Sequence, residues 1–161
     1  MVLGRAASRR LGCVKPHVPT VSEAVLRFGE GAVAPAGGTE TVLVVEDMAG
    51  LRHLATRILA SAGYTVLSAA NGGEALRLLE RDAPPIHLLL TDVVMPGMSG
   101  RALAERFLAL RPAARVLYMS GYTDDVVVRH GVLDAGMPFL AKPFTAMELT
   151  RKVRQVLDAQ N

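Results

Sequence analysis

The sequence predicts a three-layer α/β domain built around a parallel sheet, with helices on both faces and right-handed crossover connections. From Thr41 onward, strand-like and helix-like segments alternate five times along the chain. Four of the strand-like segments are short, continuous apolar runs, which are typical of strands buried on both faces of a parallel sheet. Each of these four runs ends at a polar residue, and parallel α/β sheets place their ligand sites at the carboxyl ends of the strands.

Turn and cap signals separate the elements. Gly63 can end the first helix in a left-handed turn, and Asn71 with Glu74 three residues later resembles a capping box at the start of the second. Prolines at 84–85 end that second helix, and Pro112 ends the third. In chain order the predicted strands and helices are 41–45, 48–62, 65–69, a helix from 71, 86–91, 100–110, 115–119, a helix after 123, 138–141 and 146–158.

The apolar runs end at Glu46-Asp47, Asp92, Ser120 and Lys142. If the four strands are parallel, these ends converge, so we expect three carboxylates, a hydroxyl and an amine at one site. Carboxylate oxygens suit a hard divalent cation, and a lysine ammonium can hold phosphoryl oxygens. The sequence therefore predicts a site that binds a divalent metal and a phosphoryl group.

Length and charge are consistent with one domain preceded by a basic tail. The 161 residues suit a single domain, and no apolar stretch approaches the roughly 20 residues of a membrane span. Residues 1–38 hold five Lys or Arg against two Glu, whereas the rest of the chain holds thirteen of each sign. The net charge of +3 therefore belongs to the tail, and we expect neither a nucleic-acid-binding domain nor membrane association.

We expect the domain itself to span 39–161, after a basic tail with a Gly/Ala/Pro linker over 1–38. Two interpretations of the tail stay open: a segment without fixed structure, or one short helix at 22–28 that docks on the domain or on a partner. Cys13 is the single cysteine, which excludes an internal disulfide and fits a cytoplasmic location. The arginines before it resemble a twin-arginine signal, but the apolar stretch that such a signal needs is absent.

The order of the polar strand ends resembles the receiver domains of bacterial response regulators. The resemblance covers about residues 40–158 and rests on Val44-Val45-Glu46-Asp47, the 91–100 segment, Met119-Ser120-Gly121-Tyr122 and Ala141-Lys142-Pro143-Phe144. It implies a flavodoxin-like (βα)5 fold with five parallel strands in the order 2-1-3-4-5. The stretch after Thr123 is most similar to the C-terminal receivers of hybrid sensor histidine kinases.

The resemblance gives the converging residues definite roles. Asp92 is the expected phosphoacceptor, whose carboxylate becomes an acyl phosphate. Glu46, Asp47, Asp92 and the backbone carbonyl of Val94 are the expected ligands of Mg²⁺ or Mn²⁺. Independently of the resemblance, three carboxylates in one cleft repel each other unless a cation neutralises them. Lys142 is expected to balance the charge of Asp92 and then that of the phosphoryl oxygens.

The same resemblance implies a conformational switch and its timing. Ser120 is expected to donate to the phosphoryl group, and its movement is expected to be coupled to Phe139, which should favour a buried state. Val94 and Tyr122 occupy the positions that set the lifetime of the acyl phosphate. The bond before Pro143 is expected to be cis, which would direct the Lys142 amine into the site.

We therefore expect a two-component phosphorelay receiver that takes a phosphoryl group from a phosphohistidine of a sensor histidine kinase or histidine phosphotransfer protein. It would not be an enzyme beyond its own phosphorylation and dephosphorylation, and it would be a monomer or weak dimer. The chain would be a stand-alone receiver or a piece of a hybrid kinase. The alternatives are a degenerate receiver that binds proteins without phosphorylation, and a haloacid-dehalogenase-type phosphatase. That phosphatase would need a second Asp where this chain has Val94.

Overall fold

One parallel sheet forms the middle layer of the protein. The computed structural model describes residues 37–80, 84–121 and 136–159. Five strands pair in parallel in the order β2-β1-β3-β4-β5, which confirms the expected flavodoxin-like topology. The strands are β1 (Thr41–Val45), β2 (Thr65–Ala69), β3 (Leu88–Asp92), β4 (Arg115–Ser120) and β5 (Phe139–Ala141).

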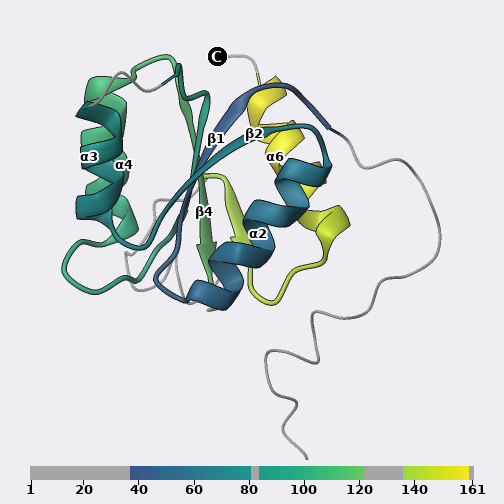
Figure 1. Ribbon diagram of the computed structural model, residues 1–161, viewed down its shortest axis with the longest axis horizontal. Coiled ribbons are helices and arrows are strands. Elements are labelled where there is room, and N and C mark those ends of the chain that lie inside the picture. The colour runs from purple at the N-terminus through teal and green to yellow at the C-terminus, as the bar shows by residue number, and fades with distance from the viewer. Residues whose placement is uncertain (1–36, 81–83, 122–135, 160–161) are drawn as a thin grey trace, which may run out of the picture.

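Helices cover both faces of this sheet. Figure 1 shows α3 and α4 on one side of the strands and α2 with α6 on the other. The predicted helices at 100–110 and 146–158 are confirmed to the residue, whereas the predicted helix after Thr123 lies outside the described residues. The described helices are α2 (Ala49–Ser61), α3 (Gly72–Glu80), α4 (Gly100–Leu110) and α6 (Ala146–Asp158).

The central strands are largely apolar because both of their faces are covered. Along β1, Val42 and Val44 belong to the core on the α2 and α6 side, while Leu43 and Val45 belong to the core on the α3 and α4 side. All four residues are fully buried. At about 25 cal/mol per Å² of apolar surface, burying each such side chain stabilises the fold by roughly 1.5–3 kcal/mol. This double burial holds the ends of β1 and β3 in fixed positions.

The helix that follows β5 has a complete N-terminal cap. The Thr145 hydroxyl accepts a hydrogen bond from the Glu148 backbone N–H at 3.2 Å, and the Glu148 carboxylate accepts one from the Thr145 N–H at 2.7 Å. Asn71 likewise accepts from the Glu74 N–H at 2.9 Å, as its spacing predicted. The start of α2 differs, because its N-cap residue Met48 makes no side-chain cap bond.

An arginine fixes the chain just before β1. Arg154 of α6 donates to Glu40 at 2.8 Å and to both carboxylate oxygens of Asp158, at 2.7 and 2.8 Å. The Gly38 N–H donates to the Ala62 carbonyl at 3.3 Å, so the segment before β1 also contacts the end of α2. Burial alone would raise the pKa of Glu40, but hydrogen bonds from nearby backbone N–H groups and from Arg154 hold it below its ordinary value.

Replacing Arg154 with Gln is expected to lower the free energy of unfolding by about 1 kcal/mol at neutral pH, since the ion pairs are partly exposed. Because the pKa of Glu40 is lowered in the folded state, its contribution is present above the ordinary value of 4.5 and is lost as the pH falls through the folded value. The difference between the wild type and Arg154→Gln should therefore shrink below pH 4.5. Urea unfolding at several pH values measures it, and a difference that grows on acidification would contradict this explanation.

Candidate functional site

Four side chains meet at the carboxyl end of the sheet. Glu46 and Asp47 follow β1, Asp92 is the last residue of β3, and Lys142 follows β5. Strands β1 and β3 are direct neighbours, which brings the acidic residues together. One carboxylate oxygen from each of Glu46, Asp47 and Asp92 lies within 4.8 Å of the others. The structure thus brings together the three carboxylates and the amine that the sequence placed at the strand ends.

Lys142 bridges two of the three carboxylates. Its Nζ atom donates to Glu46 Oε2 at 2.6 Å and to Asp92 Oδ2 at 2.8 Å. The Lys142 backbone N–H donates to the Ser120 carbonyl at 2.8 Å, which anchors the start of the loop after β5. The bond between Lys142 and Pro143 is cis. Lys142, Glu46 and Asp92 therefore form one partly buried charged group that spans β1, β3 and β5.

The Glu46 side chain is fully buried, with 0% of its surface exposed. Burial raises the pKa of Glu46 and the nearby Asp92 charge adds to the increase, while hydrogen bonding and attraction from Lys142 oppose it. A buried carboxylate is costly unless it is paired with a cation. Lys142 supplies part of that compensation, and a bound cation would supply more.

The donor set fits a hard divalent cation. Three carboxylates and one bridging ammonium leave two uncompensated negative charges when all are ionised. Asp47 is exposed, so its carboxylate can reach an ion from the solvent side. Oxygen-only donor sets with room for water are typical of Mg²⁺ sites, and Mn²⁺ accepts the same ligands. The cluster therefore has the charge and the donor atoms for Mg²⁺ or Mn²⁺.

Backbone contacts fix the position of Asp92. The Thr91 hydroxyl donates to the Asp92 carbonyl at 3.0 Å, and the Val94 N–H donates to Asp92 Oδ1 at 3.3 Å. The first residue of α4, Gly100, packs directly on the Asp92 carbonyl, so closely that a Cβ atom there would overlap with it. In the sequence, Gly100 is marked only as the end of the 91–100 motif and the start of a predicted helix, because a close backbone approach leaves no signal beyond the glycine itself.

Of the other predicted site residues, the structure describes Ser120, Phe139 and Val94 but not Tyr122. Ser120 is buried at the end of β4, beside the loop that carries Lys142. Phe139 pairs in register with Tyr118, packs against the core on the α3 and α4 side and is half-buried. Val94 is 59% exposed at the rim of the cluster, and Tyr122 lies outside the described residues.

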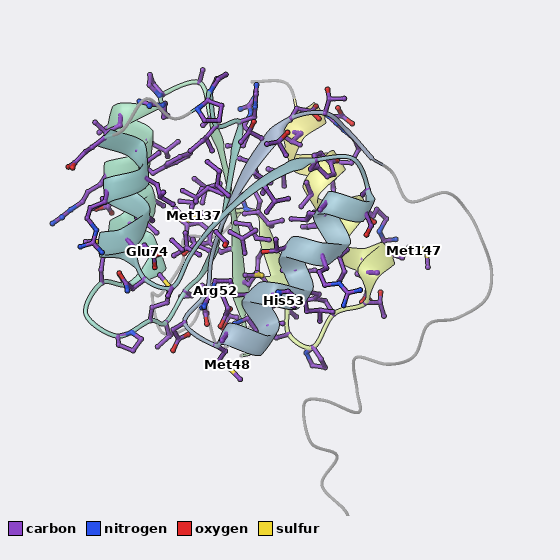
Figure 2. All side chains as sticks on the ribbon, viewed as in Figure 1. Met48, Arg52, His53, Glu74, Met137 and Met147 are labelled. Atoms are coloured by element: carbon purple, nitrogen blue, oxygen red, sulfur yellow. The ribbon has the colours of Figure 1, made fainter. Side chains whose placement is uncertain are left out.

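Sequence reasoning also missed Arg52. Its guanidinium donates to the backbone carbonyls of Glu46 at 2.6 Å and Asp47 at 3.3 Å. Figure 2 places Arg52 near Met48, at the N-terminal end of α2. One feature of the sequence could have identified it: Arg52 is a basic residue in the first turn of a predicted helix, where the helix dipole disfavours positive charge.

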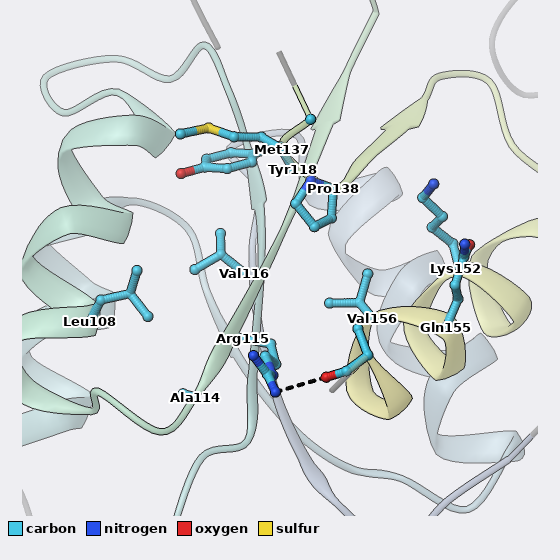
Figure 3. Close-up of a pocket in the computed structure, with 12 residues that line it drawn as sticks. Leu108, Ala114, Arg115, Val116, Tyr118, Met137, Pro138, Lys152, Gln155 and Val156 are labelled. Carbon is cyan, nitrogen blue, oxygen red and sulfur yellow. Dashed lines mark hydrogen bonds between the residues drawn. The ribbon is translucent and has the colours of Figure 1, made fainter. Parts of the chain in front are cut away.

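A hollow lies apart from the acidic cluster. It has a volume of about 510 Å³ and lies beside β4, between α4 and α6, where Arg115 donates to the Ala159 carbonyl at 2.8 Å (Figure 3). Apolar side chains such as Val116, Met137 and Val156 form much of its lining. None of the described residues that line it carries a carboxylate, so it offers no comparable metal site.

The fold and the site together define a class: a flavodoxin-like signal receiver with an acidic cluster and a lysine at the carboxyl edge of its sheet. The family model of the response regulator receiver domain matches residues 42–154. The chain belongs to this family, as the motifs around the four strand ends predicted. It is a phosphorelay receiver domain.

Comparison with known proteins agrees with this assignment. The chain is 38% identical over 124 residues to sensor kinase CckA of Brucella abortus (strain 2308), which covers 77% of this chain but only 13% of that kinase. It is 30% identical to sporulation initiation phosphotransferase F of Bacillus subtilis (strain 168), covering 73% of this chain and 94% of that protein. The chain thus spans a small part of the kinase and nearly all of the phosphotransferase.

Solved structures show the same likeness. The receiver domain from the hybrid histidine kinase CckA superposes with a TM-score of 0.57 at 37% identity, over 73% of this chain and 99% of that one. Chemotaxis response regulator CheY4 of Vibrio cholerae superposes with a TM-score of 0.63 at 27% identity, over 74% and 99%. The predicted resemblance to hybrid-kinase receivers is therefore confirmed.

In the described part of the chain, no helix combines the length and apolar character needed to cross a membrane.

Proposed function

We propose that Asp92 is the phosphoacceptor of this receiver and that it takes a phosphoryl group from a phosphohistidine donor. The observation that carries the proposal is the position of Asp92, which shares the Lys142 ammonium with the buried Glu46. An Asp92 carboxylate oxygen forms a bond to phosphorus while the bond from phosphorus to the donor imidazole nitrogen breaks. The imidazole keeps that electron pair, and Asp92 becomes an acyl phosphate.

Each neighbouring group has a role in this transfer. Glu46, Asp47, Asp92 and the Val94 backbone carbonyl would hold Mg²⁺ or Mn²⁺, which would neutralise charge on the phosphoryl oxygens. The Lys142 ammonium stabilises the same oxygens from the β5 side. Ser120 donates to the phosphoryl group once it is attached, and Phe139 moves with Ser120 as the partner-facing part of the switch.

The protein would thus serve as a signal carrier rather than an enzyme that turns over a separate substrate. Its donor would be a sensor histidine kinase or a histidine phosphotransfer protein, because such proteins present a phosphorylated histidine. No nucleic acid is needed for this activity. We expect a monomer or a weak dimer in solution.

The direct test uses the full chain, Mg²⁺ and acetyl phosphate, followed by intact mass. The proposal predicts a mass gain of one phosphoryl group that disappears when the metal is removed with a chelator. A chain that gains no phosphate would instead be a degenerate receiver that binds partners without phosphorylation. Turnover of phosphomonoesters would point to a phosphatase.

Replacing Lys142 with Met is expected to slow phosphoryl uptake by about a hundredfold at saturating Mg²⁺, because a preorganised cation is lost from the reacting group. The same change should tighten Mg²⁺ binding by roughly tenfold, since the ammonium no longer competes for two of the carboxylates. Calorimetry measures the affinity, and the rate of mass gain measures uptake. Lys142→Arg keeps the charge and should bind Mg²⁺ as the wild type does; weaker binding in Lys142→Met would contradict the assigned role.

The acyl phosphate should be long-lived, because neither Val94 nor Tyr122 offers a carboxylate or an amide to orient an attacking water. Val94 is exposed at the rim of the site, so a polar side chain there can reach the phosphoryl group without disturbing the core. Val94→Asn is expected to shorten the half-life several-fold. Loss of phosphate after removal of the donor measures this, and a half-life equal to that of the wild type would count against the role of this position.

A further inference from the structure

Arg52 lies in the first turn of α2, and its side chain turns back toward the loop that precedes the helix. Its guanidinium donates to the Glu46 carbonyl at 2.6 Å and to the Asp47 carbonyl at 3.3 Å. These two carbonyls belong to the residues whose side chains form two thirds of the acidic cluster. Arg52 is therefore bonded to the backbone of the metal-binding loop and not to its carboxylates.

This position is unfavourable for an arginine on helix grounds alone. Positive charge near a helix N-terminus interacts unfavourably with the helix dipole, which costs about 0.3–1 kcal/mol of stability. The start of α2 also lacks the usual compensation, because Met48 provides no side-chain cap and the first turn contains no acidic residue. Apart from the Arg52 bonds, the side-chain contacts of the described loop are those of the Glu46 carboxylate, which accepts from the Met48 N–H at 3.3 Å and from Lys142 Nζ at 2.6 Å.

The loop has to meet a demanding geometric condition. Successive side chains of an extended strand point to opposite faces, so neighbouring Glu46 and Asp47 could not both face one ion if β1 simply continued. The chain leaves the strand after Val45, and one carboxylate is then fully buried while the next residue is exposed. Bonds to both carbonyls restrain the two peptide planes that set these directions.

We infer that Arg52 is a positioning residue for the metal site: it braces the Glu46-Asp47 backbone so that both carboxylates face one divalent cation. The inference rests on the proposed function, since it assumes that this cluster binds Mg²⁺. Arginine suits the task because its planar guanidinium has several donors in fixed directions, whereas a lysine ammonium is a compact point charge. Groups that orient metal ligands without touching the metal typically change metal affinity by about 10–100-fold.

The test compares Mg²⁺ binding by full-length wild type, Arg52→Gln and Arg52→Lys, using calorimetry and the Mg²⁺ dependence of uptake from acetyl phosphate. Arg52→Gln is expected to bind Mg²⁺ roughly tenfold more weakly, and Arg52→Lys should fall between it and the wild type. The maximal uptake rate at saturating Mg²⁺ should stay within about twofold of the wild type, because the ion itself then restores the loop. If Arg52→Gln does not fold, Arg52→Lys carries the comparison.

Arg154→Gln is the matched control, since it also removes guanidinium bonds but at the opposite end of the sheet. It should lower the melting temperature and leave Mg²⁺ affinity unchanged. The inference is overturned if the Arg52 variants bind Mg²⁺ within twofold of the wild type, or if Arg154→Gln weakens binding equally. A wild type that neither binds Mg²⁺ nor gains phosphate would refute the proposed function, whereas an active wild type with unchanged Arg52 variants refutes only this inference.

Discussion

Asp92→Asn is expected to abolish phosphoryl uptake at every Mg²⁺ concentration while leaving the domain folded. Asparagine keeps the shape of the side chain and an oxygen that can accept from Lys142, whose Nζ lies 2.8 Å from Asp92 Oδ2. The amide lacks the anionic oxygen that attacks phosphorus, so the acyl phosphate cannot form. Intact mass after incubation with acetyl phosphate measures the result, and circular dichroism checks the fold.

Asp47→Asn is the matched control for this experiment. Asp47 belongs to the same cluster but is exposed and is not bonded to Lys142 among the described contacts. Removing it should weaken Mg²⁺ binding without removing the nucleophile, so uptake should recover as Mg²⁺ is raised. A phosphate gain retained in Asp92→Asn, or an Asp47→Asn variant that stays inactive at high Mg²⁺, would contradict the assigned roles.

Gly100→Ala is expected to lower the free energy of unfolding by about 3 kcal/mol, a large effect for a single methyl group. The added Cβ would overlap with the Asp92 carbonyl, a backbone atom that cannot rotate away. Helix α4 would have to move away from β3, which would weaken the Gly100 N–H bond to the Val93 carbonyl, now 2.9 Å. The same movement would displace Asp92, so the folded fraction should also take up phosphate more slowly.

Gly50→Ala provides the comparison for this prediction. Gly50 lies in the first turn of α2, and an added Cβ there would meet nothing within 4 Å. Alanine at such a position should stabilise the helix by up to about 1 kcal/mol. Urea unfolding of both variants measures the difference, and a Gly100→Ala protein as stable as Gly50→Ala would show that α4 does not press on the Asp92 backbone.

Much of the fold could be predicted from sequence because strand burial leaves a local pattern. The apolar run at 42–45 exists because β1 is covered on both faces, and the alternation with helices then limits the topology to a parallel sheet. Boundaries were less accurate where polar residues are involved. The third strand begins at Leu88 and not at 86, because His87 is exposed and its side chain accepts a hydrogen bond from the Thr41 N–H at 3.0 Å.

The site was predictable only as a set of residues. That Glu46, Asp92 and Lys142 meet follows from parallel strands sharing one carboxyl edge. The sequence does not indicate that Lys142 bridges both carboxylates or that Glu46 is fully buried. Both depend on how the loop after β5, which pairs with β4, places the Lys142 side chain. The contacts of Arg52 and Gly100 depend on how closely backbone carbonyls approach α2 and α4, which residue types alone do not encode.

The most direct test of the central claim is to locate the phosphoryl group. Borohydride reduces an acyl phosphate to an alcohol and so converts a phosphorylated aspartate into homoserine, which peptide mass spectrometry can find. After incubation with Mg²⁺ and acetyl phosphate, the account predicts homoserine in place of Asp92 and at no other carboxylate. Homoserine at another aspartate, or a phosphate gain that survives as a stable ester on a hydroxyl, would contradict it.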